Sequence, residues 1–382
     1  MKYRKFGKLD WQPSALGFGC MRFPVIGGNS SRIDEEPAAE MLYYAIDQGV
    51  NYLDTAYPYH GGQSEGFVGK TLEGPYREKV KLATKLPSWK IEKHEDFDFY
   101  LNEQLDRLRT EQFDFYLLHA LNQKNWDTIH SLDVLPWVEK ALADGRIAQI
   151  GFSFHDEYPV FKSIVDAYDG WDFCQIQYNF MDIDYQAGKK GLMYAAEYGM
   201  AVVIMEPLRG GRLISPPDRI QDIWDQSSQL RTPADWSLQW LWNQPEVSTV
   251  LSGMSDIQQV KENVISAANS GINSLSEDDI QIVSKVKEAY EDMALIPCTQ
   301  CGYCVPCPEG VDIVDILRIY NDSVMYDKFD FSKKTYNLFV SEDSKGNLCV
   351  VCGECEEKCP QGIPISDWME KIHNQFTVKA AE

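Results

Sequence analysis

The chain has 382 residues, 44% of them hydrophobic, and a formal net charge of −22 at pH 7. This length and apolar content suit a barrel of about 250–300 residues with a smaller additional domain. The negative charge argues against nucleic acid and anionic membrane surfaces as partners, because phosphate groups are bound by clustered Lys and Arg. No apolar run reaches the roughly 18 residues of a membrane-spanning helix, and residues 1–6 lack the apolar stretch of a signal peptide. We therefore expect a cytoplasmic protein.

Eight short runs rich in Val, Ile, Leu and Phe alternate with helical patterns. Such runs are typical of strands that are covered on both faces. In chain order they are Ala15–Gly19, Val50–Asp54, Val80–Thr84, Phe113–Leu118, Ile147–Phe152, Phe173–Gln177, Ala201–Met205 and Ser248–Leu251.

Helical periodicity falls between these runs, for example at Pro37–Gln48, Glu95–Arg109, Leu132–Asp144 and Ile257–Ala268. Alternating strands and helices predict a parallel sheet, and eight such units predict closure into an α/β barrel of the (β/α)8 (TIM) type. The alternative is an open doubly wound sheet. Against it, residues 17–21 after the first strand lack the third glycine of a dinucleotide-binding fingerprint.

A change of composition marks a second domain. The residues Ser276-Glu277-Asp278-Asp279 resemble a capping box and predict a last barrel helix that runs to about Tyr290. Met293–Pro297 is the expected linker, and clustered Cys, Pro and Gly follow it. We expect a barrel over residues 1–293 and a second domain over residues 294–382, with helices near Val311–Tyr320 and Ile365–Phe376.

Ionisable side chains stand where three consecutive predicted strands end. Asp54 closes the second strand, Lys85 follows the third and His119 follows the fourth, with Tyr59 in the loop after Asp54. A single charged residue after a strand is usually a solvated loop residue. Together they indicate one site, because the C-terminal ends of barrel strands meet at one face.

These four residue types suit the reduction of a carbonyl group, whose oxygen needs a proton when the carbon receives a hydride. Tyrosine is a poor acid at neutral pH, with a reference pKa of about 10. We expect the Lys85 ammonium to lower the pKa of Tyr59. Asp54 can pair with Lys85, and His119 can donate a hydrogen bond to the substrate oxygen. A positioned general acid contributes about 10²–10⁴ in rate.

Over roughly residues 1–290 the chain resembles the aldo-keto reductase family. The stretches that carry the resemblance are Asp54-Thr55-Ala56 with Tyr59, Ala83-Thr84-Lys85, Asp114 to His119, Gln175 to Asn179, Glu206-Pro207-Leu208, and Gly253-Met254-Ser255 with Gln259, Glu262 and Asn263. The resemblance implies a catalytic tetrad of Asp54, Tyr59, Lys85 and His119. It also implies reversible hydride transfer between NADP(H) and a small carbonyl substrate.

The resemblance places the nicotinamide carboxamide at Ser153 and Gln175. Phe154 stands where relatives carry an asparagine, with His155 as the alternative donor, and Met205 takes the place of a stacking aromatic residue. Around the pyrophosphate it implies Glu206, Leu208, Arg209, Gly210 and Arg212.

At the adenosine end the resemblance implies a further group of contacts. They are Gly253, Ser255, Gln259, Glu262 and Asn263. Many relatives hold the 2′-phosphate with an arginine where this chain has Gln259, so we expect only a modest preference for NADPH over NADH.

Eight of the ten cysteines form two runs with ferredoxin-like spacing. The second run has the bacterial C-x₂-C-x₂-C-x₃-C-P pattern, and the first is one residue shorter before its last cysteine. The tail resembles a dicluster ferredoxin, which implies two 4Fe–4S clusters with the fourth ligand exchanged between runs. One cluster would take Cys298, Cys301, Cys304 and Cys359, and the other Cys349, Cys352, Cys355 and Cys307.

Other roles for the cysteines fit less well. A zinc ribbon needs only four of the eight, and disulfides are rare in the cytoplasm. A single cluster on the second run remains the alternative. Outside the tail, we expect Cys20 and Cys174 to be buried structural thiols.

Two functions follow from these observations. The first is an NADPH-dependent reductase of aldehydes or ketones that carries iron–sulfur clusters. The second is an electron-transfer or redox-sensing protein that uses the barrel as a scaffold and acts with a redox partner protein. The complete tetrad favours the enzyme.

Overall fold

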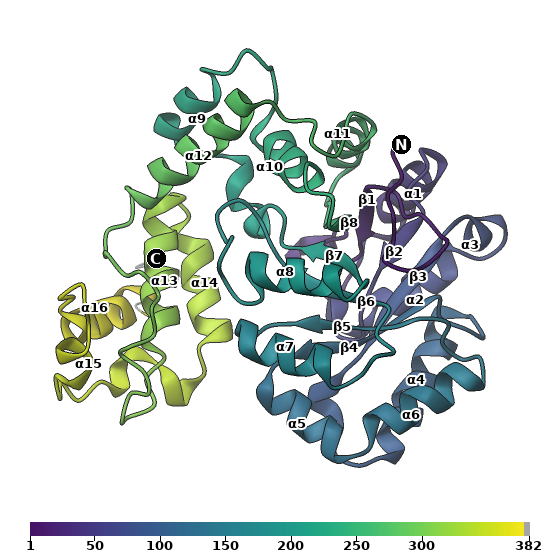
Figure 1. Cartoon of the computed structure of the whole chain (residues 1–382), viewed down its shortest axis with the longest axis horizontal. Helices are drawn as coiled ribbons and strands as arrows, with labels where there is room; N and C mark the ends of the chain where they lie inside the picture. The colour runs from purple at the N-terminus through teal and green to yellow at the C-terminus, as the bar shows by residue number, and fades with distance from the viewer. Residues whose placement is uncertain (378–382) are drawn as a thin grey trace. The chain divides into compact units, whose positions relative to one another are not determined.

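The computed structural model describes residues 1–377 and separates into two compact units. Unit 1 comprises Met1–Gly210 and Arg231–Ile280 (Figure 1). Unit 2 comprises Gly211–Leu230 and the chain from Gln281 onward. The predicted domain of residues 294–382 extends beyond the described part of the chain at residues 378–382.

Unit 1 is built on a closed barrel of eight parallel strands in sequential order. Each strand pairs with the next, and the last pairs with the first. This confirms the predicted barrel and excludes the open sheet. The strands are β1 Leu16–Gly19, β2 Tyr52–Asp54, β3 Lys81–Leu86, β4 Phe115–Leu121, β5 Ile150–Phe154, β6 Phe173–Gln177, β7 Ala201–Met205 and β8 Val247–Ser252.

The strand predictions are accurate to a few residues, and β6 and β7 have the predicted bounds. The largest differences are in β4, which continues to Leu121 rather than ending at Leu118, and in β5, which begins at Ile150 rather than Ile147. In β4 the difference is at the strand end. The pairing of β4 with β5 shifts in register between Leu118 and Leu121, and Ala120 has a positive φ of 52°. This irregularity lies next to His119, at the end of the strand where the predicted site is located.

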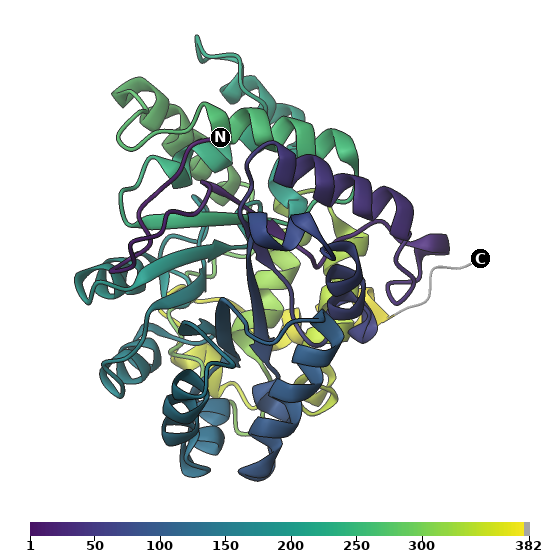
Figure 2. The same cartoon turned by 90° about the vertical axis from the view of Figure 1, so that its right-hand side faces the viewer.

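Helices follow the strands and surround the barrel (Figures 1 and 2). In unit 1 they are α1 Glu35–Asp47, α2 Ser64–Thr71, α3 Pro75–Lys79, α4 Glu95–Leu108, α5 Gln123–Ser131, α6 Val134–Ala143, α7 Tyr158–Asp166, α8 Gly188–Glu197, α10 Pro233–Trp242 and α11 Ile257–Ala268. Helix α12 spans Glu277–Glu291 and crosses the division between the units. Its N-terminus has the predicted capping box, because the Ser276 hydroxyl and the Asp279 carboxylate each accept a hydrogen bond from the other's backbone N–H.

The barrel is filled by its inward-pointing side chains. Phe6, from the segment before β1, packs against Tyr52, Phe115 and Phe173 inside the barrel. Such an aromatic layer excludes water from the interior. Asp54, Lys85 and His119 come after this layer, toward the C-terminal ends of β2, β3 and β4.

Unit 2 is helical. It contains α9 Asp218–Trp224, α13 Ile313–Met325, α14 Phe329–Phe339, the short α15 Glu354–Glu357 and α16 Ile365–Thr377. Helices α13 and α16 confirm the two predicted tail helices, whereas α14 was not predicted. The core of unit 2 is formed by α13, α14 and α16 together with Ile296 and Ile363, and six of the cysteines pack against it. Within residues 1–377, no helix is both long and apolar enough to cross a membrane.

Candidate active site

The alternation of side chains along strands explains which residues meet inside the barrel. Successive residues point to opposite faces of a strand. Tyr52 and Ala83 belong to the interior cluster, so Asp54 and Lys85, two residues further on, also point inward. The same parity brings His119 to the interior face of β4, two residues after Leu117. The structure thus brings together the predicted groups at the C-terminal ends of neighbouring strands.

Lys85 is at the centre of this group and is completely buried. Its Nζ donates hydrogen bonds to Asp54 Oδ1 at 2.6 Å and to the Thr55 carbonyl oxygen at 2.7 Å. It also lies 3.5 Å from the Tyr59 hydroxyl oxygen. A buried ammonium is tolerated when its charge is paired and its protons are bound. Asp54 pairs the charge, and Asp54 and Thr55 each accept one of the three ammonium protons. The third proton of Lys85 is left for the contact with Tyr59.

The electrostatics of Tyr59 differ from the prediction. Burial raises the pKa of Tyr59 above its ordinary value, and the opposing effect of Lys85 does not cancel this rise. The expected net lowering of this pKa is therefore wrong for the protein without ligands, because desolvation of the phenolate outweighs its attraction to the ammonium. Burial also disfavours the Lys85 ammonium, but Asp54 and Tyr59 outweigh it and raise the pKa of Lys85. At neutral pH Tyr59 keeps its proton and Lys85 keeps its charge.

His119 stands beside Tyr59, with the two rings nearly perpendicular and their centroids 6.3 Å apart. Burial, the charge of Lys85 and His155 together hold the pKa of His119 well below its ordinary value. The imidazole is therefore neutral at pH 7 and has one N–H to donate. Its Nδ1 is buried and has no hydrogen-bond partner within residues 1–377.

Three of the predicted nicotinamide residues also point into the barrel. Ser153 on β5 lies in register with Gln175 on β6, and Met205 ends β7. The Gln175 Nε2 is 3.6 Å from the Met205 sulfur, while its Oε1 is buried without a partner in the described chain. An unsatisfied buried amide oxygen is costly, and a carboxamide N–H₂ would satisfy it. These residues therefore fit a nicotinamide.

Two neighbours on β5 have separate positions. Phe154 is buried among the outer helices, with its ring 5.2 Å from that of Phe161 on α7. Although Phe154 aligns with the asparagine of relatives, its ring packs against α7 and does not supply the contact that the asparagine is expected to make. His155 is exposed and follows the strand end, where it remains the alternative donor.

The two arginines after β7 are bound to carboxylates. Arg209 Nε lies 3.2 Å from Asp182 Oδ2, and both side chains are more than nine-tenths buried. Arg212 belongs to unit 2, where its Nη1 is 2.7 Å from Asp322 Oδ2. Between them Gly210 has a positive φ of 67°, which glycine adopts without strain. A phosphate at either arginine would have to compete with the carboxylate that is bound to it.

The predicted adenosine residues gather at the N-terminus of α11. Asp256 caps the helix by accepting a hydrogen bond from the Gln259 backbone N–H at 2.9 Å, and it also accepts one from Gln259 Nε2 at 2.6 Å. The Ser255 backbone N–H donates to Gln259 Oε1 at 3.0 Å. Asn263 is bonded to Ser252, and Glu262 to Gln258. Asp256 therefore adds a negative charge beside Gln259, the residue that is predicted to face the 2′-phosphate of NADPH.

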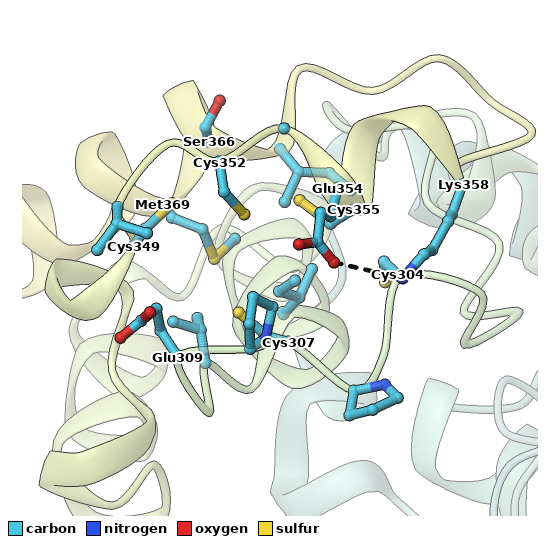
Figure 3. A pocket seen from close by; sticks show the side chains of 17 residues that line it. Cys304, Cys307, Glu309, Cys349, Cys352, Glu354, Cys355, Lys358, Ser366 and Met369 are labelled. Carbon is cyan, nitrogen blue, oxygen red and sulfur yellow. Dashed lines mark ion pairs between the residues drawn. The ribbon is translucent and has the colours of Figure 1, made fainter.

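The eight tail cysteines line two pockets in unit 2. Cys298, Cys301, Cys304 and Cys359 border one pocket. Cys307, Cys349, Cys352 and Cys355 border the other (Figure 3), which Cys304 also touches. These are the two groups that the cross-run pattern predicts. Each pocket thus offers the four thiols that a 4Fe–4S cluster needs.

The same backbone conformation recurs in both cysteine runs. The residue before the second cysteine has a φ of 56° in each run, at Gln300 and at Val351. Glycines with positive φ stand at matching places in the two runs, and these are Gly302, Gly310, Gly353 and Gly362. The two runs therefore share these features of their backbone conformation.

No three His, Cys, Asp or Glu side chains within residues 1–377 lie close enough to share a single metal ion. In a cubane cluster each cysteine binds a different iron atom. None of the ten cysteines forms a disulfide. Cys20 and Cys174 are fully buried, as expected.

Some residues near the site escaped the sequence analysis. The Trp89 ring lies 5.0 Å from that of His119 and is 44% exposed. Its position four residues after Lys85, in the loop that follows a strand, was the available signal. Glu65 and Gln104 are fully buried beside β3, and no motif marks them.

Comparisons with known proteins agree with this geometry. Residues 15–288 match the Aldo/keto reductase family, and residues 297–363 match a 4Fe-4S dicluster domain. The first match covers most of the chain, which therefore belongs to the aldo/keto reductase family and carries a C-terminal iron–sulfur domain. The chain is an oxidoreductase by fold and family.

Several relatives span the barrel. "Uncharacterized oxidoreductase YqkF" of Bacillus subtilis is 28% identical over 74% of this chain and 95% of its own length. "NADH-specific methylglyoxal reductase" of Escherichia coli is 24% identical over 76% of this chain and 100% of its own. Among solved structures, the holo form of aldo-keto reductase AKR11C1 from Bacillus halodurans is 27% identical, with a TM-score of 0.62 over 75% of this chain and 96% of its own.

Proposed function

We propose that this protein reduces an aldehyde or ketone to an alcohol, with a nicotinamide as hydride donor and Tyr59 as proton donor. The observation that carries the proposal is the buried contact of Lys85 with Asp54 and Tyr59 at the C-terminal face of the barrel. A bound nicotinamide would supply the hydride. Reduction of the carbonyl to an alcohol also requires one proton on the substrate oxygen, and in this proposal Tyr59 provides that proton.

Each member of the tetrad has a distinct task in this proposal. As the carbonyl oxygen gains negative charge, Tyr59 transfers its proton to it. The Lys85 ammonium stabilises the resulting phenolate, and Asp54 keeps Lys85 charged and oriented. Neutral His119 donates a hydrogen bond to the same oxygen, which aligns the carbonyl group.

The proposed cofactor is NADPH, with a modest preference over NADH. An aldo-keto reductase from Klebsiella pneumoniae has been solved in complex with NADPH, whereas the Escherichia coli relative is named as NADH-specific. The carboxylate of Asp256, which binds Gln259 where many relatives carry an arginine, weakens the attraction for a 2′-phosphate. A small ratio of affinities is therefore expected.

We further propose two 4Fe–4S clusters, one in each cysteine-lined pocket, with a structural or interaction role. A nicotinamide gives up two electrons as hydride, whereas a 4Fe–4S cluster normally takes one. The tetrad needs neither cluster to reduce a carbonyl. The packing of six cysteines on the core of unit 2 supports a role in holding that unit together. Reduced thiols and clusters suit the cytoplasm.

The test of the catalytic proposal is oxidation of NADPH by anaerobically purified protein against a panel of aldehydes and ketones. We expect turnover with at least one carbonyl compound. In Tyr59→Phe, turnover should fall about 10²-fold or more, because the ring stays and the acid is lost. The cofactor Kd should change little. Near-normal turnover of this variant would remove Tyr59 from the mechanism.

The role of the clusters has its own test. The clusters are reduced with dithionite, the reductant is removed, and oxidised nicotinamide or a carbonyl compound is added. We expect the visible absorbance of the reduced clusters to persist. Prompt reoxidation by the protein alone would overturn the structural role and indicate an electron-coupled reductase.

A further inference from the structure

The backbone of Lys85 lies beyond the end of its neighbouring strand. Alternate carbonyl groups of a strand point to the same side. The Ala83 carbonyl oxygen accepts a hydrogen bond from the Thr55 N–H at 2.9 Å, on the side of β2. The Lys85 carbonyl points the same way, but β2 has ended at Asp54. A buried carbonyl at this position needs another donor.

Gln104 on α4 supplies that donor. Its Nε2 donates to the Lys85 carbonyl oxygen at 3.0 Å. The other side of the same amide is also engaged, because Gln104 Oε1 accepts from the Tyr116 hydroxyl at 2.6 Å. Gln104 and Tyr116 are both fully buried. One side chain therefore bridges β3 and β4 behind the catalytic lysine.

Glu65 on α2 determines which way the Gln104 amide faces. A carboxylate only accepts hydrogen bonds, and Glu65 Oε1 accepts from Gln104 Nε2 at 2.5 Å and from the Thr84 hydroxyl at 2.7 Å. Arg107 Nη1 lies 3.3 Å from the other carboxylate oxygen. The N–H₂ group of Gln104 must therefore face Glu65 and Lys85, and its oxygen must face Tyr116.

We propose that Gln104, oriented by Glu65 and Tyr116, is a positioning residue that sets the reach of Lys85 toward Tyr59. Lys85 is then held at both ends, by Asp54 and Thr55 at its ammonium and by Gln104 at its carbonyl. Its contact with Tyr59 is the longest of its hydrogen bonds, at 3.5 Å. A small shift of the backbone would therefore break this contact first. The inference rests on the proposed reductase function.

The test is the variant Gln104→Met, with Gln239→Met as matched control. Gln239 is also a buried glutamine that bonds a backbone carbonyl, that of Ser266 at 2.9 Å, but it lies on α10. We expect Gln104→Met to lower kcat about tenfold or more, with KM and cofactor Kd within about twofold. Because Lys85 then helps Tyr59 less to ionise, the alkaline limb of the kcat–pH profile should move to higher pH. Gln239→Met should leave kcat and the kcat–pH profile unchanged.

A readout without substrate separates this inference from the reductase proposal. Hydrogen exchange of the peptide that covers residues 83–86 should speed up in Gln104→Met and not in Gln239→Met. If the wild-type chain turns over no carbonyl compound, the proposed function fails while the exchange experiment still tests the positioning.

A milder variant guards against loss of folding. Tyr116→Phe keeps the ring and releases the Gln104 amide, so it should produce a smaller change in the same direction. Two results would overturn the inference. One is a Gln104→Met protein that matches Gln239→Met in pH profile and exchange, and the other is an unfolded Gln104→Met with an unchanged Tyr116→Phe.

Discussion

Arg212 and Asp322 form a buried ion pair across 110 residues of sequence, with 2.7 Å between Nη1 and Oδ2. Arg212 belongs to the segment that follows β7, and Asp322 lies on α13. Arg318, one turn earlier on the same helix, has its Nη1 3.8 Å from the same carboxylate oxygen. The segment after β7 is thereby tied to the helix whose residues Ile313 and Leu317 line the two cysteine pockets.

Asp322→Asn should destabilise unit 2. The substitution keeps the shape of the side chain but removes the charge that faces a buried arginine, and breaking such a pair costs about 3–5 kcal/mol. The free energy of unfolding would be measured with denaturant, following the cluster absorbance. Asp315→Asn, which breaks a more exposed pair with Arg318, should cost about 1 kcal/mol or less. Equal losses of stability in Asp322→Asn and Asp315→Asn would show that the buried pair of Arg212 with Asp322 has no special role in unit 2.

Stability should fall in mild acid because of His60. Its Nε2 accepts the Phe23 N–H at 3.2 Å, and its Nδ1 is 2.8 Å from the Ser30 carbonyl oxygen, so the neutral tautomer is required. Burial lowers the pKa of His60. The unfolded chain therefore takes up a proton near pH 6.5 while the folded chain resists it. This contribution to stability is complete above about pH 6.5 and is lost as the pH falls.

The pH dependence of unfolding in His60→Gln isolates this contribution. A glutamine does not titrate, so the variant should show a flatter decline below about pH 6.5 than the wild type. His130→Gln, at an exposed position on α5, serves as the control and should keep the wild-type slope. An unchanged slope in His60→Gln would rule out the role of His60.

Paired cysteine variants distinguish the proposed ligand groups. Cys307→Ala with Cys349→Ala removes two ligands from one pocket, so about four iron atoms per chain should remain out of about eight. Cys304→Ala with Cys307→Ala removes one ligand from each pocket and should lose both clusters. Iron and sulfide analysis after anaerobic reconstitution provides the measurement. Four iron atoms in the wild type would favour the one-cluster alternative.

Gln259→Arg should strengthen the preference for NADPH. An arginine at the N-terminus of α11 can reach a 2′-phosphate, and a hydrogen bond to a charged group contributes about 1.5–3 kcal/mol. The ratio of the NADH to the NADPH Kd should rise about tenfold, less if Asp256 captures the new side chain. Gln258→Arg adds the same charge one residue away and is the control. The same rise in both variants would indicate a general effect of charge.

Much of the fold could be predicted because it depends on local patterns. A strand covered on both faces must be apolar throughout, so β6 and β7 are visible as Phe173–Gln177 and Ala201–Met205. Asp54, Lys85 and His119 could be grouped because barrel strands all end at one face. The unpredicted helix α14 has no such signal, since its sequence mixes aromatic and charged residues, with Tyr336 the only aromatic side chain of the helix in the buried core.

The remaining features depend on distances between residues that are far apart in the chain. Composition and spacing were enough to predict the eight strand–helix units and to group Asp54, Lys85 and His119, because these depend on local period and on where strands end. The full tetrad with Tyr59 and the grouping of the cysteines were implied by the resemblance to known families. Composition and spacing could not reveal that Arg212 is bound by Asp322, or that Gln104 replaces a missing strand partner at Lys85. Nor could they give the net pKa shift of Tyr59. Burial and long-range pairing exist only once the chain has folded, and in a medium of low dielectric they decide which charges are neutralised and which protons are held.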